Sequence, residues 1–218
     1  MIKRSIAVLI SGNGSNLQAL IDACAAPDYP AKIVLVLSNK DEVKGLTLAK
    51  LAGIPTQVIS HKSHTSRDTF DAELQKAITA SGAELVCLAG FMRVLTDGFV
   101  KKWEGRMLNI HPSLLPSFKG MHTHEEALAA GVKIHGCTVH FVTAEMDSGP
   151  IIIQAAVPVL PGDNVTELSA RVLKAEHQIY PYALRMLASG KLKLENGRVS
   201  KTYQAVHEYT LFNPDVRF

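Results

Sequence analysis

The sequence predicts an α/β fold in which helices flank a mostly parallel sheet that ends in an antiparallel hairpin. Continuous apolar runs, typical of strands buried on both faces, alternate with amphipathic segments through the first half of the chain. This alternation indicates parallel βαβ units with right-handed crossovers. Two later strands, expected over 136–142 and 151–157, are joined by a short connection, so we expect them to pair antiparallel.

The expected elements of the first half follow in regular order. Strands are expected over 6–11, 32–38, 56–60, 85–89 and 107–110. Helices are expected near 17–25, 43–52 and 97–103, with another that starts at a capping box over 65–68 and ends before Gly82.

The second half continues with a short helix over 125–130 and, after the hairpin, a long helix with Asp163 as N-cap and Pro181 as a kink or break. A last hairpin over 192–201 should turn at Asn196-Gly197, and residues 202–218 give no clear signal. Because no linker separates the halves, we expect one Rossmann-like domain over 1–218. Its parts would be a phosphate-binding half (1–105), a catalytic half (106–200) and a tail (201–218).

Composition argues against several classes of protein. The net charge is only +3 and the basic residues are scattered, which does not favour a nucleic-acid surface. No apolar stretch is long enough to span a bilayer. The three cysteines form no Cys-x-x-Cys pair, which is typical of reduced thiols, so we expect a cytoplasmic protein.

A glycine loop, Gly12-Asn13-Gly14-Ser15-Asn16, joins the first strand to the first helix. Small residues let backbone N–H groups approach a phosphate at a helix N-terminus, although a plain tight turn has the same pattern. A dinucleotide fingerprint would have a third glycine where Leu17 stands, and an acidic residue after the second strand, which ends in Ser38-Asn39-Lys40. The loop therefore favours a monophosphate over NAD.

A second polar group stands at the end of the strand over 107–110. Asn109 and His111 are two residues apart, so their side chains can point the same way, and Pro112 restricts the backbone that follows. An amide N–H can donate to a developing oxyanion, and an imidazole can move a proton. Asp147, at the tip of the hairpin, would support a charged imidazole if it reaches His111, although Asp-Ser-Gly-Pro is also an ordinary turn sequence.

Three segments end strands of the parallel sheet and should face one crevice, since ligands in such sheets bind beyond the carboxyl ends of the strands. These segments are 12–16, 90–95 and 109–111. Arg67, in the first turn of a helix, is either kept for an anion or simply solvated, and Glu176 by itself would be an exposed charge. Histidines are dense between 111 and 140, but their spacing is not diagnostic of zinc, so we expect no metal.

Five segments together resemble the phosphoribosylglycinamide formyltransferases, a folate-dependent family of purine synthesis. They occur in the family's order between residue 5 and about residue 190, and they are 12–19, 88–93, 109–116, 122–124 and 147–150. In this family an acidic residue often stands at the position of Ala144 and a glycine at that of Ser148, so details of this loop differ.

The resemblance implies the substrates and the residues that meet them. The co-substrate would be 10-formyltetrahydrofolate and the acceptor glycinamide ribonucleotide, with no metal, nucleic acid or membrane, in a monomer or homodimer. The implied catalytic residues are Asn109, His111 and Asp147. The implied ribonucleotide contacts are Gly14, Ser15, Asn16 and Glu176, and the implied folate contacts are Arg67, Met92, Arg93, Val94, Leu95, Asn109, Thr143, Ala144, Glu145, Met146 and Asp147.

The implied reaction is direct attack of the amine on the formyl carbon, with the catalytic residues stabilising the oxyanion and moving the proton. The nearest alternative is formyltetrahydrofolate hydrolysis, against which the glycine loop argues. Methionyl-tRNA formyltransferases share the core motif but carry an added C-terminal domain, for which we expect 218 residues to leave no room. A non-catalytic nucleotide-binding module and a dehydrogenase are alternatives from other classes.

Overall fold

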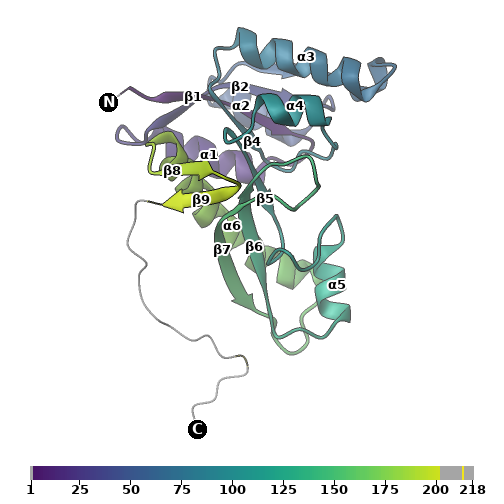
Figure 1. The fold of residues 1–218 in the computed structure, drawn as a ribbon. Coiled ribbons are helices and arrows are strands. Elements are labelled where there is room, and N and C mark those ends of the chain that lie inside the picture. Colours follow the sequence, from purple (N-terminus) through teal and green to yellow (C-terminus); the bar gives the residue numbers. More distant parts are fainter. Residues whose placement is uncertain (1, 202–212, 214–218) are drawn as a thin grey trace.

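A seven-stranded sheet forms the centre of the computed structural model, which describes residues 2–201 and 213 (Figure 1). The strand order is β3-β2-β1-β4-β5-β6-β7. Strands β1 to β5 pair in parallel, and β6 and β7 add antiparallel, which confirms the predicted fold class. The strands are β1 (Arg4–Ile10), β2 (Ala31–Ser38), β3 (Thr56–Val58), β4 (Leu85–Leu88), β5 (Met107–His111), β6 (Ile134–Phe141) and β7 (Ile151–Pro158).

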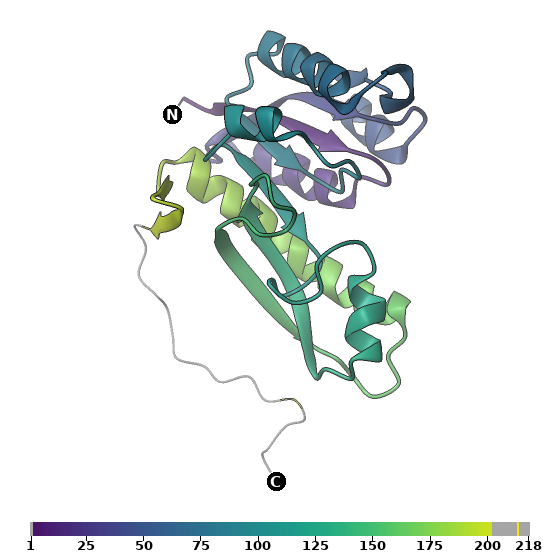
Figure 2. The same cartoon turned by 45° about the vertical axis from the view of Figure 1, so that its right-hand side comes forward.

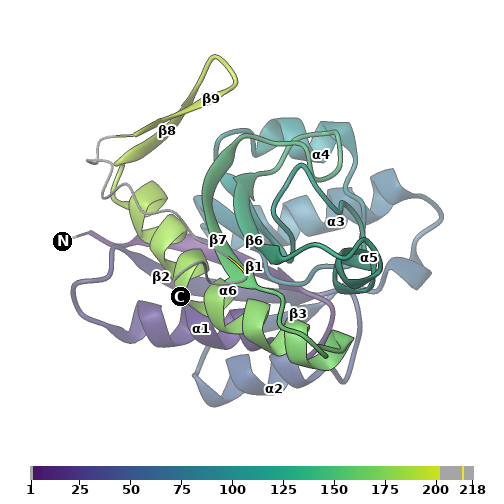
Figure 3. The same cartoon turned by 90° about the horizontal axis from the view of Figure 1, so that it is seen from below.

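Helices cover both faces of this sheet (Figure 3). One face carries α1 (Ser15–Ala25), α2 (Lys44–Leu51) and α6 (Val165–Ala188), and the other carries α3 (Arg67–Ala80) and α4 (Asp97–Lys102). Figure 2 shows α6 running along the sheet from the hairpin of β8 (Leu192–Glu195) and β9 (Arg198–Lys201) towards α5 (Thr123–Ala129). A short 3₁₀ turn, η1 (His61–Ser63), precedes α3.

Strand β1 shows why the apolar runs are continuous. Its side chains alternate between two cores: Ile6, Val8 and Ile10 pack with α1, α2 and α6, whereas Ala7 and Leu9 pack with α3 and α4. A strand buried on both faces needs apolar residues at every position. None of the described helices is long and apolar enough to cross a membrane.

The long helix differs from its prediction in two ways. Pro181 neither ends nor divides it, because α6 is a single element from Val165 to Ala188 with Pro181 inside. An interior proline costs about 3 kcal/mol, and the apolar face that α6 buries against the sheet outweighs this cost. The N-cap is Asn164, whose side chain accepts from the Glu167 N–H, and not Asp163, whose carboxylate pairs with Arg171 at 2.6 Å.

Smaller shifts occur at other helix starts. The capping box of α3 uses Ser66 and Thr69, one residue later than predicted, and α1 begins at Ser15 rather than near 17. The predicted Asn196-Gly197 turn is confirmed, with φ of 51° and 71°. The tail predicted to start at residue 201 lies almost wholly outside the described residues, and the division into functional halves stays a prediction.

Candidate active site

Two adjoining cavities lie at the carboxyl ends of the strands. The central cavity, of about 280 Å³, is lined from β4, β5, β6 and the loops after them. The loop cavity, of about 190 Å³, is lined by the glycine loop and by residues after β4. Gly90 and Met92 line both cavities, so two ligands can lie side by side there. The three segments predicted to face one crevice are therefore brought together.

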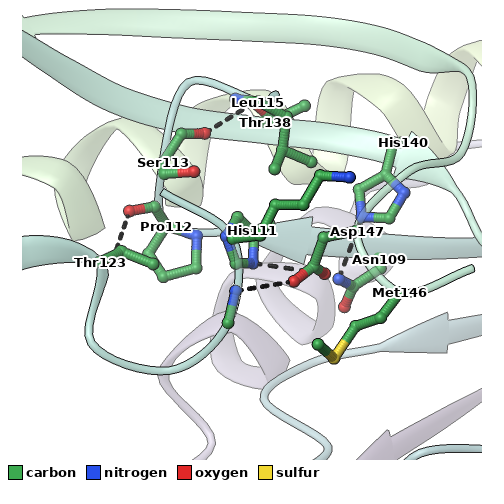
Figure 4. Close-up of polar contacts among 12 residues, drawn as sticks. Asn109, His111, Pro112, Ser113, Leu115, Thr123, Thr138, His140, Met146 and Asp147 are labelled. Carbon is green, nitrogen blue, oxygen red and sulfur yellow. Dashed lines mark hydrogen bonds and ion pairs between the residues drawn. The ribbon is translucent and has the colours of Figure 1, made fainter. Parts of the chain in front are cut away.

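Asn109 lies on β5, directly opposite His140 of β6 (Figure 4). The Asn109 Nδ2 and His140 Nε2 atoms are 3.2 Å apart, and His140 Nδ1 is 2.9 Å from the Phe141 carbonyl oxygen. Burial lowers the pKa of His140, so its ring is neutral, with Nδ1–H donating and Nε2 accepting. One N–H of the Asn109 amide is thus used, and the second is left for a ligand in the central cavity.

His111 and Asp147 form a buried pair on the wall of the same cavity. His111 Nδ1 lies 3.5 Å from Asp147 Oδ1, and the two side chains are 6% and 10% exposed. The His111 Nε2 atom is 3.0 Å from the Phe118 carbonyl oxygen, so both ring nitrogens face acceptors and a protonated imidazole can donate on both sides. The prediction that Asp147 reaches His111 is confirmed.

The backbone around Asp147 holds its carboxylate in place. Asp147 Oδ2 accepts a 3.0 Å hydrogen bond from the Gly120 N–H. The residue itself has φ of 51°, a left-handed conformation that Asp tolerates better than most residues. Two residues later, a Cβ on Gly149 would lie 1.7 Å from the Phe141 carbonyl oxygen. The glycine therefore lets the loop return close to β6, a role beyond that of an ordinary turn residue.

The loop after His111 is held by side chains that the sequence analysis did not single out. Thr138 Oγ1 donates to the Ser113 carbonyl at 2.7 Å and accepts from the Leu115 N–H at 3.1 Å (Figure 4). Gln154 donates to Thr138 Oγ1 and to the Leu115 carbonyl, both at 2.9 Å. No local signal marks these residues, because polar groups on β6 and β7 become loop anchors only once the strands are paired.

The glycine loop packs directly on the start of α2. Gly14 has φ of 75°, and a Cβ there would lie 2.6 Å from Gly45 Cα. The Gly45 N–H also bonds to the Gly12 carbonyl at 3.1 Å. The role of Gly45 was not predicted, since a glycine in the first turn of a helix is by itself unremarkable in a sequence.

Asn16 and Glu176 meet beside this loop. Asn16 Nδ2 donates to Glu176 Oε2 at 2.6 Å, and Glu176 is only 6% exposed. The expectation of an exposed charge was wrong, because α1 packs against α6 and Asn16, in the first turn of α1, binds the Glu176 carboxylate. Burial raises the pKa of Glu176, and the hydrogen bond from Asn16 partly opposes this shift. Asn16 Oδ1 is buried without a described partner.

The predicted folate contacts divide into two groups. Most of them line the central cavity: Met92, Arg93, Val94, Leu95, Asn109, Thr143, Ala144, Met146 and Asp147. Arg67, the exposed first residue of α3, and Glu145, whose side chain is 79% exposed and lies 3.8 Å from Lys119 Nζ, do not. Within the described ranges, no cluster of three or more His, Cys, Asp or Glu residues could hold a metal ion.

Comparison with known proteins places this site in a family. Residues 4–184 match the family described as formyl transferase, and the chain belongs to that family. It is 49% identical over 190 residues to the phosphoribosylglycinamide formyltransferase of Escherichia coli, covering 87% of this chain and 90% of that protein. A crystal structure of glycinamide ribonucleotide transformylase 1 from Symbiobacterium toebii superposes with a TM-score of 0.89 at 47% identity, covering 91% of this chain and 94% of that one.

Other relatives are much longer. The chain is 57% identical over 198 residues to the trifunctional purine biosynthetic protein adenosine-3 of Bos taurus. That match covers 90% of this chain but only 20% of the bovine protein, so the chain spans about a fifth of such relatives.

Proposed function

We propose that this protein transfers a formyl group from 10-formyltetrahydrofolate to the amine of glycinamide ribonucleotide. The observation that carries the proposal is the contact between the two cavities. One is lined by the glycine loop, the other has an amide, an imidazole and a carboxylate, and they share Gly90 and Met92. The relatives of similar length, named phosphoribosylglycinamide formyltransferases, support the same assignment.

The loop cavity would take the nucleotide. Backbone N–H groups of Gly14, Ser15 and Asn16 stand at the N-terminus of α1, where the helix dipole favours a phosphate. Glu176 lines neither cavity, but its carboxylate is bound to Asn16 of the loop, and there it would meet the nucleotide. The folate ring would enter the central cavity between residues 92–95 and the loop over 143–147, while Arg67 and Glu145 would contact parts of the folate outside it.

The chemical step would need no covalent enzyme intermediate. The amine nitrogen attacks the formyl carbon and forms the new C–N bond, and the carbonyl oxygen becomes an oxyanion. The free Asn109 N–H and the positive charge of protonated His111, supported by Asp147, stabilise that oxyanion. The bond from the formyl carbon to folate N10 then breaks, and the proton lost by the amine is transferred to N10. Holding both substrates side by side lowers the entropic part of the barrier.

One assay tests this proposal against the hydrolase alternative. The protein is mixed with 10-formyltetrahydrofolate in the presence and absence of glycinamide ribonucleotide, and folate absorbance and free formate are followed. We expect turnover only with the acceptor, because the loop cavity is built for a phosphorylated one. Release of formate at the same rate without the acceptor would instead identify a hydrolase. The cytoplasmic location and the monomer or homodimer state remain proposals.

We expect Glu176→Gln to weaken nucleotide binding while stabilising the fold. The raised pKa of Glu176 means that the folded protein binds this proton more tightly than the unfolded chain does. Ionising Glu176 therefore lowers the free energy of unfolding. This loss is absent below the ordinary pKa of 4.5 and reaches its full size above the raised pKa of the folded state. Thermal unfolding should give the variant a higher Tm at pH 7, with the difference shrinking as the pH falls towards 4.5.

The same variant should raise the KM for glycinamide ribonucleotide about tenfold, the effect of losing a charge-assisted hydrogen bond. Glu104→Gln, which neutralises an exposed carboxylate after α4, serves as the control and should change neither quantity. A lower Tm for Glu176→Gln at neutral pH would contradict the argument.

A further inference from the structure

Ser11 stands where the carboxyl ends of three neighbouring strands meet. It follows β1, which lies between β2 and β4 in the sheet. Its Oγ donates to Asn39 Oδ1 at 2.5 Å and accepts from the Met92 N–H at 2.7 Å. Ser11 and Asn39 are 5% and 1% exposed. A buried chain of hydrogen bonds therefore links the end of β2, the start of the glycine loop and the segment after β4.

The only proton that the Ser11 hydroxyl can donate is already used in this chain of hydrogen bonds. Ser11 lines the loop cavity, where a serine would ordinarily be taken for a phosphate ligand. A phosphate oxygen needs a donor, and a serine hydroxyl has only one O–H, which here points to Asn39 Oδ1. What Ser11 provides instead is an acceptor for the backbone of Met92.

That backbone belongs to an irregular wall, residues 90–96, between the end of β4 and the start of α4. Side chains of other elements hold two of its N–H groups. Ser11 Oγ accepts a hydrogen bond from the Met92 N–H at 2.7 Å, and Asp71 Oδ2, on α3, accepts one from the Thr96 N–H at 2.6 Å. The side chains of Met92 and Val94 are 57% and 53% exposed, so their own burial does little to fix the wall. Its shape therefore depends on these two anchors together with the buried side chain of Leu95, which is 7% exposed, and the anchor at its Met92 end is the one that Ser11 provides.

We propose that Ser11 is a positioning residue that shapes the central cavity from the side of the nucleotide loop. By holding the Met92 N–H, it keeps residues 90–96 in the conformation that accepts the folate ring. The inference rests on the proposed function in taking folate as the ligand of that cavity. It assigns Ser11 to folate binding, although its position in the chain, directly before Gly12, suggests the nucleotide.

The test compares Ser11→Ala with the intact protein in two ligand titrations. Dissociation constants are measured separately for tetrahydrofolate and for glycinamide ribonucleotide by calorimetry. We expect the constant for tetrahydrofolate to rise about tenfold, the effect of leaving the partly buried Met92 N–H without its partner. The constant for the nucleotide should change less than twofold. Ser81→Ala removes a comparable serine hydrogen bond, to the Ile78 carbonyl at the end of α3, and should change neither constant.

Amide hydrogen exchange gives a readout that needs no ligand. Peptides covering residues 90–96 should exchange faster in Ser11→Ala than in the intact protein, and Ser11→Cys, which has a somewhat larger side chain and a weaker acceptor, should lie between them. Loss of nucleotide binding with unchanged tetrahydrofolate binding and unchanged exchange would overturn the inference and make Ser11 a phosphate ligand. If the intact protein binds no tetrahydrofolate, the proposed function fails, and unchanged exchange in Ser11→Ala would separately refute the anchoring role.

Discussion

Asp147→Asn and His111→Ala should each lower the rate of formyl transfer by about 10² or more, the range for losing an oxyanion-stabilising or proton-transferring group. The amide of Asn keeps the shape of the carboxyl group and the contact with the Gly120 N–H, but it removes the charge that faces His111 Nδ1 at 3.5 Å. His111→Ala removes the imidazole itself. Steady-state turnover with saturating 10-formyltetrahydrofolate and glycinamide ribonucleotide measures both effects.

Because the two side chains act as one unit, the double variant should be about as slow as the slower single variant rather than slower by the product of the two effects. Asp163→Asn is the matched control, since it neutralises another paired carboxylate, bound to Arg171 at 2.6 Å at the start of α6, away from both cavities. It should keep its turnover. Near-normal rates in a folded Asp147→Asn protein would refute the role given to the pair.

The parts of the fold that sequence reasoning predicted are those set by local periodicity. Strand β1 is apolar at every position because both of its faces are buried, and this pattern is visible without knowing its partners. Helix starts were shifted by a residue or two, as at Ser15 and Ser66, because several neighbouring residues can cap a helix and tertiary packing selects among them.

The parts that sequence reasoning missed depend on contacts between distant segments. Asn16 and Glu176 are 160 residues apart, and nothing near either position signals that α1 packs against α6. Pro181 is tolerated for the same reason, since packing along the whole helix decides its continuity. Asn109 and His111 were found because a strand end and the proline after His111 are local features. The pairing of His111 with Asp147 was predicted and is confirmed, but it depends on the path of the hairpin loop, for which no local signal exists.

We expect Gly14→Ala to raise the KM for glycinamide ribonucleotide more than tenfold. The backbone of Gly14 has φ of 75°, a conformation that costs an alanine roughly 1–2 kcal/mol. The added Cβ would also lie 2.6 Å from Gly45 Cα, a backbone atom that cannot rotate away. The loop must therefore move off the start of α2, and the N–H groups proposed to bind the phosphate move with it.

Gly82→Ala separates these two causes. Gly82, which follows the C-cap residue Ser81 of α3, has φ of 71°, and a Cβ there would meet nothing within 4 Å. That variant should lose only the stability that the strained φ costs, which corresponds to a fall in Tm of about 2–4 °C per kcal/mol in a domain of this size. Its KM for the nucleotide should be unchanged. Gly14→Ala should lose more stability and also nucleotide affinity, while tetrahydrofolate binding persists. If Gly14→Ala matched Gly82→Ala in both Tm and KM, the contact with Gly45 would have no part in holding the loop.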